Sequence, residues 1–179
     1  MRGRATIGLY NSYDPRKLHE AHRRALARAG PIAHAYDFNV ATFGFPYGKE
    51  MRTPADIVEW ISGSTSIGED GKYLVDLAQK GRFQAFDFPK GGFPPQLGLS
   101  VLTTCRPLPN KRMNLREACE MLGDGQSILL VFGLGPRGVP DEVFEMCERN
   151  MDITDKGVSL ETCTALGAVP AAIWARLRH

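Results

Sequence analysis

The sequence of 179 residues lacks the features that mark several classes of protein. It has no run of about 20 apolar residues, so we expect no membrane-spanning helix. Its first residues, MRGRATIGLY, contain no long apolar core and no small-residue cleavage site, so we expect no signal peptide. Neither sign of charge dominates, because 22 basic residues stand against 20 acidic ones. These absences predict a cytoplasmic protein with no membrane segment.

Cysteine is scarce, and its spacing excludes two further kinds of site. No two of the four cysteines lie within three residues of each other, and the four histidines lie far from them in the sequence. The cysteines are Cys105, Cys119, Cys147 and Cys163. Zinc fingers and CxxC redox motifs need closer spacing. We therefore expect no metal site, and reduced thiols that fill the core.

What the sequence does contain is the composition of an ordinary globular domain. Apolar residues make up 43% of the chain and charged residues 23%, as in most folded proteins. A chain of this length buries roughly 70% of the surface of its unfolded state, so one core is sufficient. We predict a single domain over residues 1–179.

Candidate strands and helices alternate along the chain. Apolar runs predict strands at residues 5–10, 32–37, 83–88, 97–104, 127–132 and 151–154. Helical spacing and capping residues predict helices at residues 14–29, 53–62, 72–80 and 114–123 and from residues 140 and 159, with a loop over 62–71. Gly30 and Pro31 would end the first helix, and Ser159 would cap the last. The alternation predicts an α/β fold, with a mainly parallel sheet flanked by helices.

One glycine-rich segment admits a dinucleotide-binding interpretation. Residues 133–138, GLGPRG, follow an apolar strand and precede a helix, and Asp152 lies near the distance of a ribose-binding acid. However, Pro136 and Pro140 move the helix start beyond the last glycine, whereas a pyrophosphate needs the helix N-terminus at the glycines. An NAD(P)-binding Rossmann oxidoreductase is therefore one alternative function.

The C-terminal third resembles a different family. The segments LLVFGLGPRGVPDEV and MDITDKGVSLETCTALGA resemble two motifs of TrmH-like members of the SPOUT superfamily of RNA methyltransferases. The matching positions are Gly133, Arg137, Gly138, Val139, Ile153, Gly157, Ser159, Leu160, Cys163, Thr164 and Ala165. Arg24 matches an arginine of the family's first motif, because it stands six residues before Gly30. Residues 39–96 match no motif of the family and are the least assignable part.

The resemblance implies a fold, an activity and a set of site residues. The fold is an α/β knot, in which the C-terminal part forms a deep trefoil knot. The activity is methylation of tRNA or ribosomal RNA with S-adenosylmethionine as the cofactor. The implied catalytic residues are Arg24, Ser159 and Glu161. The implied cofactor-binding residues are Leu102, Thr103, Phe132, Gly133, Leu134, Gly135, Gly138, Ile153, Gly157, Leu160 and Thr164, among which the glycines would present bare backbone to the cofactor.

The sequence departs from the family at two motif positions. Gly135 stands where the family has glutamate, and Glu161 stands where it has asparagine. Because these side chains help to shape the site of ribose methylators, a ribose 2′-oxygen and a base nitrogen are both open as targets. A non-catalytic RNA-binding protein of the same fold is the second alternative function.

The distribution of charge predicts an RNA-binding surface. Basic residues gather in residues 1–28 and 105–116, whereas acidic residues dominate in 133–161. The predicted phosphate contacts are Arg16, Lys17, Arg23, Arg24, Arg106, Lys111 and Arg112. Phe43, Phe45 and Tyr47 would be available for stacking with bases, with local loop packing of the two phenylalanines as the alternative.

The last helix predicts a second partner, another copy of the chain. It carries an apolar stripe made of Leu166, Val169, Ile173, Trp174 and Leu177. No later element can cover this stripe, and an exposed apolar patch usually has a partner. The resemblance also implies a homodimer, with the cofactor site at the subunit interface. Burial of the stripe against the chain's own first helix is the alternative.

Overall fold

The computed structural model describes residues 1–63, 69 and 71–179, so part of the loop predicted over 62–71 lies outside the described residues. Its strands form one sheet in the order β3-β2-β1-β5-β4-β6, and every pairing is parallel. The strands are β1 (Ala5–Tyr10), β2 (Asn39–Phe43), β3 (Phe83–Phe86), β4 (Leu99–Thr103), β5 (Ile128–Gly133) and β6 (Arg149–Met151). The predicted α/β fold with a parallel sheet is confirmed. All six strands end at the same edge, which we call the carboxyl edge.

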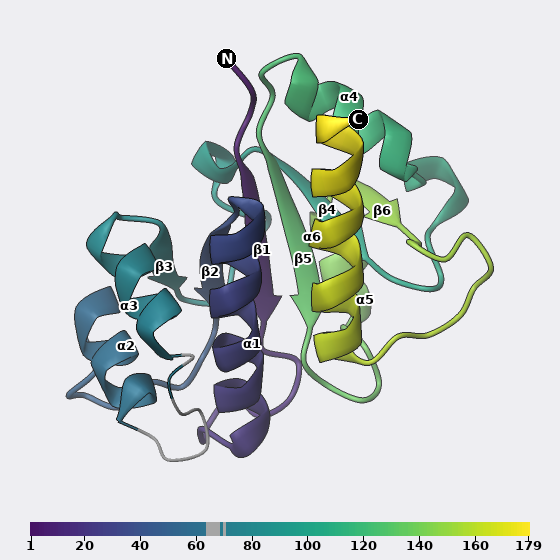
Figure 1. Cartoon of the computed structure of the whole chain (residues 1–179). Helices are drawn as coiled ribbons and strands as arrows, with labels where there is room; N and C mark the ends of the chain where they lie inside the picture. The colour runs from purple at the N-terminus through teal and green to yellow at the C-terminus, as the bar shows by residue number, and fades with distance from the viewer. Residues whose placement is uncertain (64–68, 70) are drawn as a thin grey trace.

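Helices cover the two faces of the sheet unequally. On the front face, α1 (Glu20–Tyr36) and α6 (Thr162–Arg178) lie side by side (Figure 1). The helices α2 (Pro54–Ser62) and α3 (Gly71–Gln79) pack beside α1, and α4 (Leu115–Gly123) packs beside α6. The back face is covered by the short helix α5 (Asp141–Met146) and by the segment over residues 88–98.

Alternate side chains of the strands belong to two separate cores. In β5, Leu130 and Phe132 belong to the front core, whereas Leu129 and Val131 belong to the back core, as the two-residue period of a strand requires. All four are buried. The continuous apolar run at residues 127–132 is therefore a strand buried on both faces, as predicted.

Two helix starts that the sequence predicts are confirmed by their capping geometry. Thr53 caps α2 by accepting a hydrogen bond from the backbone N–H of Asp56 at 3.1 Å. Asn114 caps α4 in the same way, through the backbone N–H of Glu117 at 2.9 Å. Each cap joins residues three apart, so the local sequence is sufficient to specify it.

The prediction for the first helix is wrong at both ends. The helix α1 begins at Glu20 and continues through Gly30 and Pro31 to Tyr36, so the predicted strand over 32–37 does not exist. A proline inside a helix removes one backbone hydrogen bond, but packing outweighs this loss. Gly30 is buried against α3, where a Cβ would lie 3.1 Å from Cδ1 of Leu74.

The prediction that Ser159 caps the last helix is also wrong. The N-cap of α6 is Glu161, whose carboxylate accepts a hydrogen bond from the backbone N–H of Thr164 at 3.2 Å. Ser159 lies in the loop between β6 and α6. Pro170 lies inside α6, and its side chain is buried.

The apolar stripe of α6 is covered by earlier elements of the same chain. Leu166, Val169 and Ile173 are fully buried in the front core, where α6 packs between α1 and α4 (Figure 1). The ring centroid of Trp174 lies 5.5 Å from that of Tyr36 in α1. The prediction of an uncovered stripe is therefore wrong, and the stripe gives no support to a homodimer. The trefoil knot stays a prediction, because strand order and pairing do not define how the chain is threaded.

Candidate functional site

The carboxyl edge of the sheet brings together the loops that follow β1, β4, β5 and β6. The helices α1 and α6 both begin at this edge (Figure 1). In open α/β sheets, ligands bind beyond the carboxyl ends of the strands. We therefore take this edge as the candidate site.

Ser12, which the sequence analysis missed, joins the loop after β1 to the loop after β5. Its hydroxyl oxygen accepts hydrogen bonds from the backbone N–H groups of Leu134 and Gly135, at 3.0 and 2.9 Å. A Cβ on Gly135 would lie 2.6 Å from the carbonyl oxygen of Ser12, and a Cβ on Gly133 would lie 2.7 Å from Cγ1 of Val139. A side chain at either glycine would therefore disturb the packing of the loops against each other, and their part in cofactor binding stays a prediction.

Two other glycines at this edge do present bare backbone. Gly138 and Gly157 have φ angles of 76° and 69°, in the left-handed region that favours glycine. A Cβ on Gly138 would meet no atom within 4 Å, and a Cβ on Gly157 would meet only the carbonyl oxygen of Cys105, at 3.7 Å. The surface beside both residues is thus open to a ligand.

Asp152 fixes the shape of the loop after β6. Its side chain is 8% exposed. One carboxylate oxygen accepts hydrogen bonds from the N–H and hydroxyl groups of Thr154, at 2.9 and 2.7 Å, and the other accepts from the N–H of Gly157, at 2.8 Å. Burial raises the pKa of Asp152, but these hydrogen bonds together lower it by more than burial raises it. The pKa therefore lies below its usual range. The ionised carboxylate therefore holds Gly157 in place.

Three hydrogen bonds tie the ends of the central strands to each other and to α6. The hydroxyl of Thr162, in the first turn of α6, donates to the carbonyl oxygen of Gly133 at 2.7 Å. The hydroxyl of Thr103 donates to the carbonyl oxygen of Val131 at 2.9 Å. The backbone N–H of Thr104 donates to the carbonyl oxygen of Met151 at 3.0 Å. The two predicted motif segments therefore meet in one body.

The predicted cofactor-binding residues fall into two groups. Leu102 and Phe132 are 0% and 1% exposed, and their side chains belong to the back and front cores, so only their backbone faces the carboxyl edge. The others lie at or beside the carboxyl edge: Thr103, Gly133, Leu134, Gly135, Gly138, Ile153, Gly157, Leu160 and Thr164. Ile153 and Leu160, both half-buried, supply apolar surface there.

The charges of the predicted catalytic residues Arg24 and Glu161 both act on the thiol of Cys163, in the first turn of α6. Burial and the Glu161 carboxylate raise the pKa of the Cys163 thiol, and the charges of Arg24 and Arg28 on α1 oppose this rise. Burial also raises the pKa of Glu161, but hydrogen bonds from the backbone of Cys163 and Thr164 lower it below its usual range. The two predicted catalytic residues therefore come from different elements, Arg24 from α1 and Glu161 from the N-cap of α6. Ser159 lies exposed in the preceding loop.

Some of the predicted RNA-binding cations are exposed, and others contact groups of the chain itself. Arg16, Lys17, Arg106 and Arg112 are exposed. Arg23 is half-buried, and its guanidinium lies 4.4 Å from the centroid of the Trp60 ring.

Lys111 and the predicted stacking residues are engaged inside the molecule. The Lys111 ammonium donates to the carbonyl oxygens of Phe144, Glu145 and Cys147 at 2.8–2.9 Å, so it stabilises the C-terminal end of α5. Phe43 and Phe45 are buried in the two cores, so the prediction that they stack with bases is wrong. The hydroxyl of the half-buried Tyr47 lies 3.0 Å from that of Thr42, within hydrogen-bond distance.

The described residues form neither a metal cluster nor a membrane-spanning helix. No group of three or more His, Cys, Asp and Glu side chains among them could hold a metal ion. None of the helices formed by these residues is long and apolar enough to cross a membrane.

The dinucleotide-binding alternative does not fit the geometry. The strand order places β5 beside β1, whereas the Rossmann order places β4 there. The helix α5 begins at Asp141, beyond Gly138, so its N-terminus is not at the glycines. Two backbone N–H groups of the glycine loop are held by Ser12, and the carboxylate of Asp152 is occupied by its own loop.

Comparisons of sequence connect the chain to relatives. Residues 5–174 match the model of a family described as DUF531, a protein of unknown function. The chain is also similar to the uncharacterized protein MJ0224 of Methanocaldococcus jannaschii. The two are 40% identical over 176 residues, which cover 98% of this chain and 96% of that protein.

Comparisons of structure connect the fold to methyltransferases. The structure resembles a probable methyltransferase from Bordetella pertussis Tohama I, with a TM-score of 0.64, 15% identity and coverage of 98% of this chain and 96% of that one. A protein studied for 2-OH methylation of C/U34 on tRNA gives a TM-score of 0.57, 16% identity and coverage of 98% and 97%. The SpoU methyltransferase AviRb from Streptomyces viridochromogenes, in complex with the cofactor AdoMet, gives a TM-score of 0.54 and 11% identity. The match covers 98% of this chain and 58% of that one.

These similarities bear on the resemblance drawn from the motifs. The structures superpose over nearly the whole chain, which confirms the resemblance for the fold. The sequence identity is low, so the similarity shows the fold alone. The chain therefore belongs to the DUF531 family and has the fold of the SpoU and TrmH methyltransferases.

Proposed function

We propose that this protein is an S-adenosylmethionine-dependent RNA methyltransferase. The observation that carries the proposal is the meeting of the two motif segments at the carboxyl edge, where Thr162 of the second segment donates to the carbonyl oxygen of Gly133 in the first. Proteins with the same fold support it, because one was solved with AdoMet and another was studied for methylation of tRNA.

The residues at this edge fit S-adenosylmethionine. The cofactor has an adenine ring, a ribose and an amino-acid part, which need backbone hydrogen bonds and apolar contact more than side-chain charge. Gly138 and Gly157 offer open backbone, and Ile153 and Leu160 offer apolar surface. When bound, the cofactor supplies a methyl group that is activated by its sulfonium.

Arg24 and Glu161 would hold the target nucleotide. Hydrogen bonds keep the pKa of Glu161 below its usual range, so at neutral pH the group is a carboxylate. A carboxylate accepts a hydrogen bond from a ribose hydroxyl or from a base N–H group and can take up its proton. The guanidinium of Arg24, on α1, would pair with a phosphate of the same nucleotide. Both ribose and base targets fit this arrangement.

Exposed cations surround the edge and would neutralise the phosphates of the RNA. Arg16 and Lys17 follow β1, Arg106 follows β4 and Arg137 follows β5. Phosphate contacts release counterions, so the affinity for RNA would fall steeply as salt is added. Lys111 is left out of this surface, because its ammonium holds the end of α5.

Isothermal titration with S-adenosylmethionine and with NAD tests the cofactor. We expect binding of S-adenosylmethionine alone, and binding of NAD alone would overturn the proposal. Gly157→Ala should weaken the binding at least tenfold, because it adds a methyl group beside the open backbone. Gly81→Ala is the matched control, since Gly81 has nearly the same φ angle, 68°, and lies in the turn between α3 and β3. We expect the control to retain its affinity within about twofold.

The substrate can be found by comparing modified nucleosides in a deletion strain and its parent by mass spectrometry. Loss of one methylated nucleoside, and its restoration by the purified protein with the cofactor in vitro, would name the target atom. An RNA-binding protein without catalytic activity would bind RNA and restore no methyl group.

The homodimer and the cytoplasmic location stay predictions. The family resemblance implies the homodimer, whereas the stripe on α6 gives it no support, being buried within the chain. Light scattering at micromolar concentration tests it directly, because a dimer has twice the 19.7 kDa mass of the chain.

A further inference from the structure

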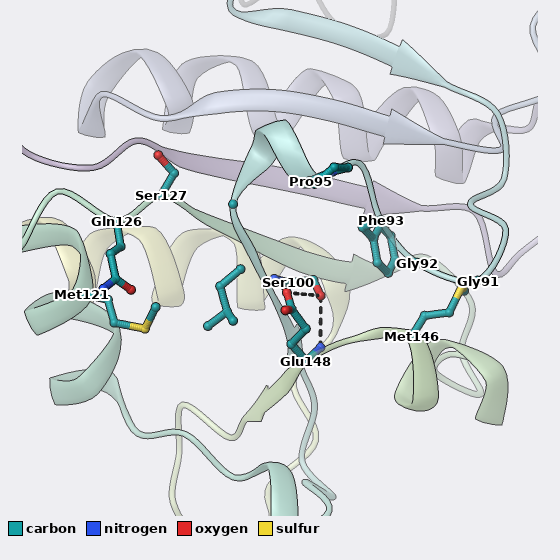
Figure 2. A pocket seen from close by; sticks show the side chains of 12 residues that line it. Gly91, Gly92, Phe93, Pro95, Ser100, Met121, Gln126, Ser127, Met146 and Glu148 are labelled. Carbon is teal, nitrogen blue, oxygen red and sulfur yellow. Dashed lines mark hydrogen bonds between the residues drawn. The ribbon is translucent and has the colours of Figure 1, made fainter.

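A cleft crosses the back face of the sheet, between the segment over residues 88–98 and α5. It consists of two adjoining hollows of about 600 and 560 Å³, and Gly91 and Met146 line both. Figure 2 shows the first hollow, with Phe93 from that segment, Met146 from α5, and Ser100 and Glu148 nearby. The cleft lies on the opposite face of the sheet from α1 and α6.

Aromatic rings line the cleft. The ring centroid of Tyr10, at the end of β1, lies 5.6 Å from that of Phe88 and 6.4 Å from that of Phe93. Phe88 is 37% exposed, which is unusual for a large apolar side chain of this protein. The faces of such rings attract organic cations.

Three carboxylates stand along the opposite wall. Glu142 and Glu145 line the second hollow, and Glu148 lines the first. Glu148 is held in position, because one of its carboxylate oxygens accepts a hydrogen bond from the backbone N–H of Ser100 at 3.0 Å. Within the described residues, none of the three forms an ion pair. Lys90 also lines the second hollow, so its charge offsets part of this wall, and the three carboxylates leave the cleft with net negative charge.

The hydroxyl of Tyr10 provides a second, independent sign of a ligand. Tyr10 is 4% exposed and lines the second hollow. Its hydroxyl forms no hydrogen bond with the described residues. The hydroxyl therefore opens into the hollow, where it is available to a ligand as a hydrogen-bond donor and acceptor. Burial, followed by the charge of Glu142, raises the pKa of Tyr10, which places this carboxylate near the hydroxyl.

We propose that this cleft binds an aliphatic polyamine, a flexible chain of ammonium groups joined by short methylene spacers. Glu142 and Glu145 are three residues apart on one helix, which separates such side chains by about 5–6 Å. A three- or four-carbon spacer places two ammonium groups at a similar separation. The ammonium groups pair with the carboxylates and donate to the Tyr10 hydroxyl oxygen, and the methylene groups lie on Phe88 and Met146. RNA is repelled by the same carboxylates, so this site is independent of the proposed function.

Isothermal titration of the full-length protein with spermidine, at neutral pH and low salt, tests the proposal. We expect saturable binding to the wild-type protein. Glu142→Gln/Glu145→Gln removes two charges with little change of shape and should weaken the binding at least tenfold. Tyr10→Phe keeps the ring and removes the hydroxyl, and it should weaken the binding several-fold.

Matched controls separate this site from general attraction of a cation to a protein. Glu50→Gln/Glu59→Gln makes the same change of charge at exposed positions outside the cleft and should leave the affinity within about twofold. Butylamine, with a single ammonium group, should bind more weakly than spermidine. Absence of saturable binding to the wild-type protein, or equal losses in the two double variants, would overturn the proposal. Circular dichroism of each variant confirms that it is folded.

Discussion

The carboxyl edge and the back-face cleft belong to the same sheet, but they differ in how their polar groups are bonded. The polar groups of the edge have hydrogen-bond partners within the chain, whereas several of the cleft have none among the described residues. At the edge, Ser12 and Thr162 bond to neighbouring loops, Asp152 bonds within its own loop, and exposed cations surround them. In the cleft, the Tyr10 hydroxyl and the carboxylate of Glu142 have no partner within the described residues.

This difference shows how one small domain can offer two separate surfaces for ligands of opposite charge. The edge is organised in advance by its own hydrogen bonds, so its loops need little rearrangement to bind. The cleft keeps unpaired groups that a cation would satisfy. The two surfaces lie close together in the sequence, because Arg137 of the edge precedes the acidic α5 by only a few residues. The exposed cations lie in the loops at the edge, whereas the carboxylates of α5 lie on the back face.

The largest expected effect separates the two surfaces by function. Arg24→Ala removes the α1 cation whose charge acts on Cys163, and it should lower methyl transfer by at least about a hundredfold, as loss of a transition-state contact does. Spermidine binding should stay within twofold of the wild-type value, because the cleft lies on the other face of the sheet. Single-turnover assays and titration measure the two quantities on one preparation.

The matched control for Arg24→Ala is Arg116→Ala. Arg116 is exposed on α4, where its guanidinium pairs with Glu120 at 3.1 Å. Equal loss of methyl transfer in the two variants would show that Arg24 contributes only general positive charge.

A second prediction compares how tightly glycines are packed in the two regions. Gly135→Ala places a Cβ 2.6 Å from the carbonyl oxygen of Ser12 and should lower the free energy of unfolding by about 1–3 kcal/mol. Gly92→Ala, in the cleft segment, meets no atom within 4 Å. It should change this free energy by less than about 1 kcal/mol. Urea unfolding measures both, and similar losses would mean that the edge is no more closely packed than the cleft.

The smallest expected effect is a pH dependence that arises at the edge. Burial, followed by the charge of His19, lowers the pKa of His22 below its ordinary value of about 6.5. Its Nδ1 accepts a hydrogen bond from the backbone N–H of His19 at 3.0 Å, so its protonated Nε2 donates to Oδ1 of Asn11 at 2.9 Å. Below pH 6.5 His22 is protonated in the unfolded chain, whereas in the folded chain it stays neutral to a lower pH. The free energy of unfolding should therefore fall as the pH falls below 6.5.

Urea titrations between pH 5 and pH 8 measure this slope. Asp14 does not contribute to the slope in that range, because its carboxylate stays ionised throughout it. The backbone N–H of Arg16, followed by the side chain of His19, lowers the Asp14 pKa to about 2, so its contribution is lost only as the pH falls below about 4. His34→Gln, which changes an exposed histidine, should keep the slope. A constant free energy across the range would contradict a neutral, buried His22.

The features that the sequence predicted correctly are those decided by neighbouring residues. The caps at Thr53 and Asn114 each depend on a residue three positions further along. The apolar run of β5 is a strand buried on both faces because all its residues are apolar. The motif resemblance led to the correct fold, since it depends on the order of short segments.

The features that the sequence could not predict depend on residues far apart. The first helix continues through Gly30 and Pro31 because α3 packs against it, which outweighs the local stop signals. Ser12 bonds to residues 134 and 135, and nothing in the sequence around a serine indicates a partner more than a hundred positions away.

The sequence by itself determined the α/β class, most helix and strand positions and the two segments that form the candidate site, because periodicity and capping act within a few residues. Only the tertiary structure decided that the stripe on α6 is buried, that Lys111 holds α5, and that Tyr10 lines a cleft beside Glu142. These outcomes depend on which elements pack against each other, because the free energy of burying a side chain is set by neighbours that are remote in the sequence.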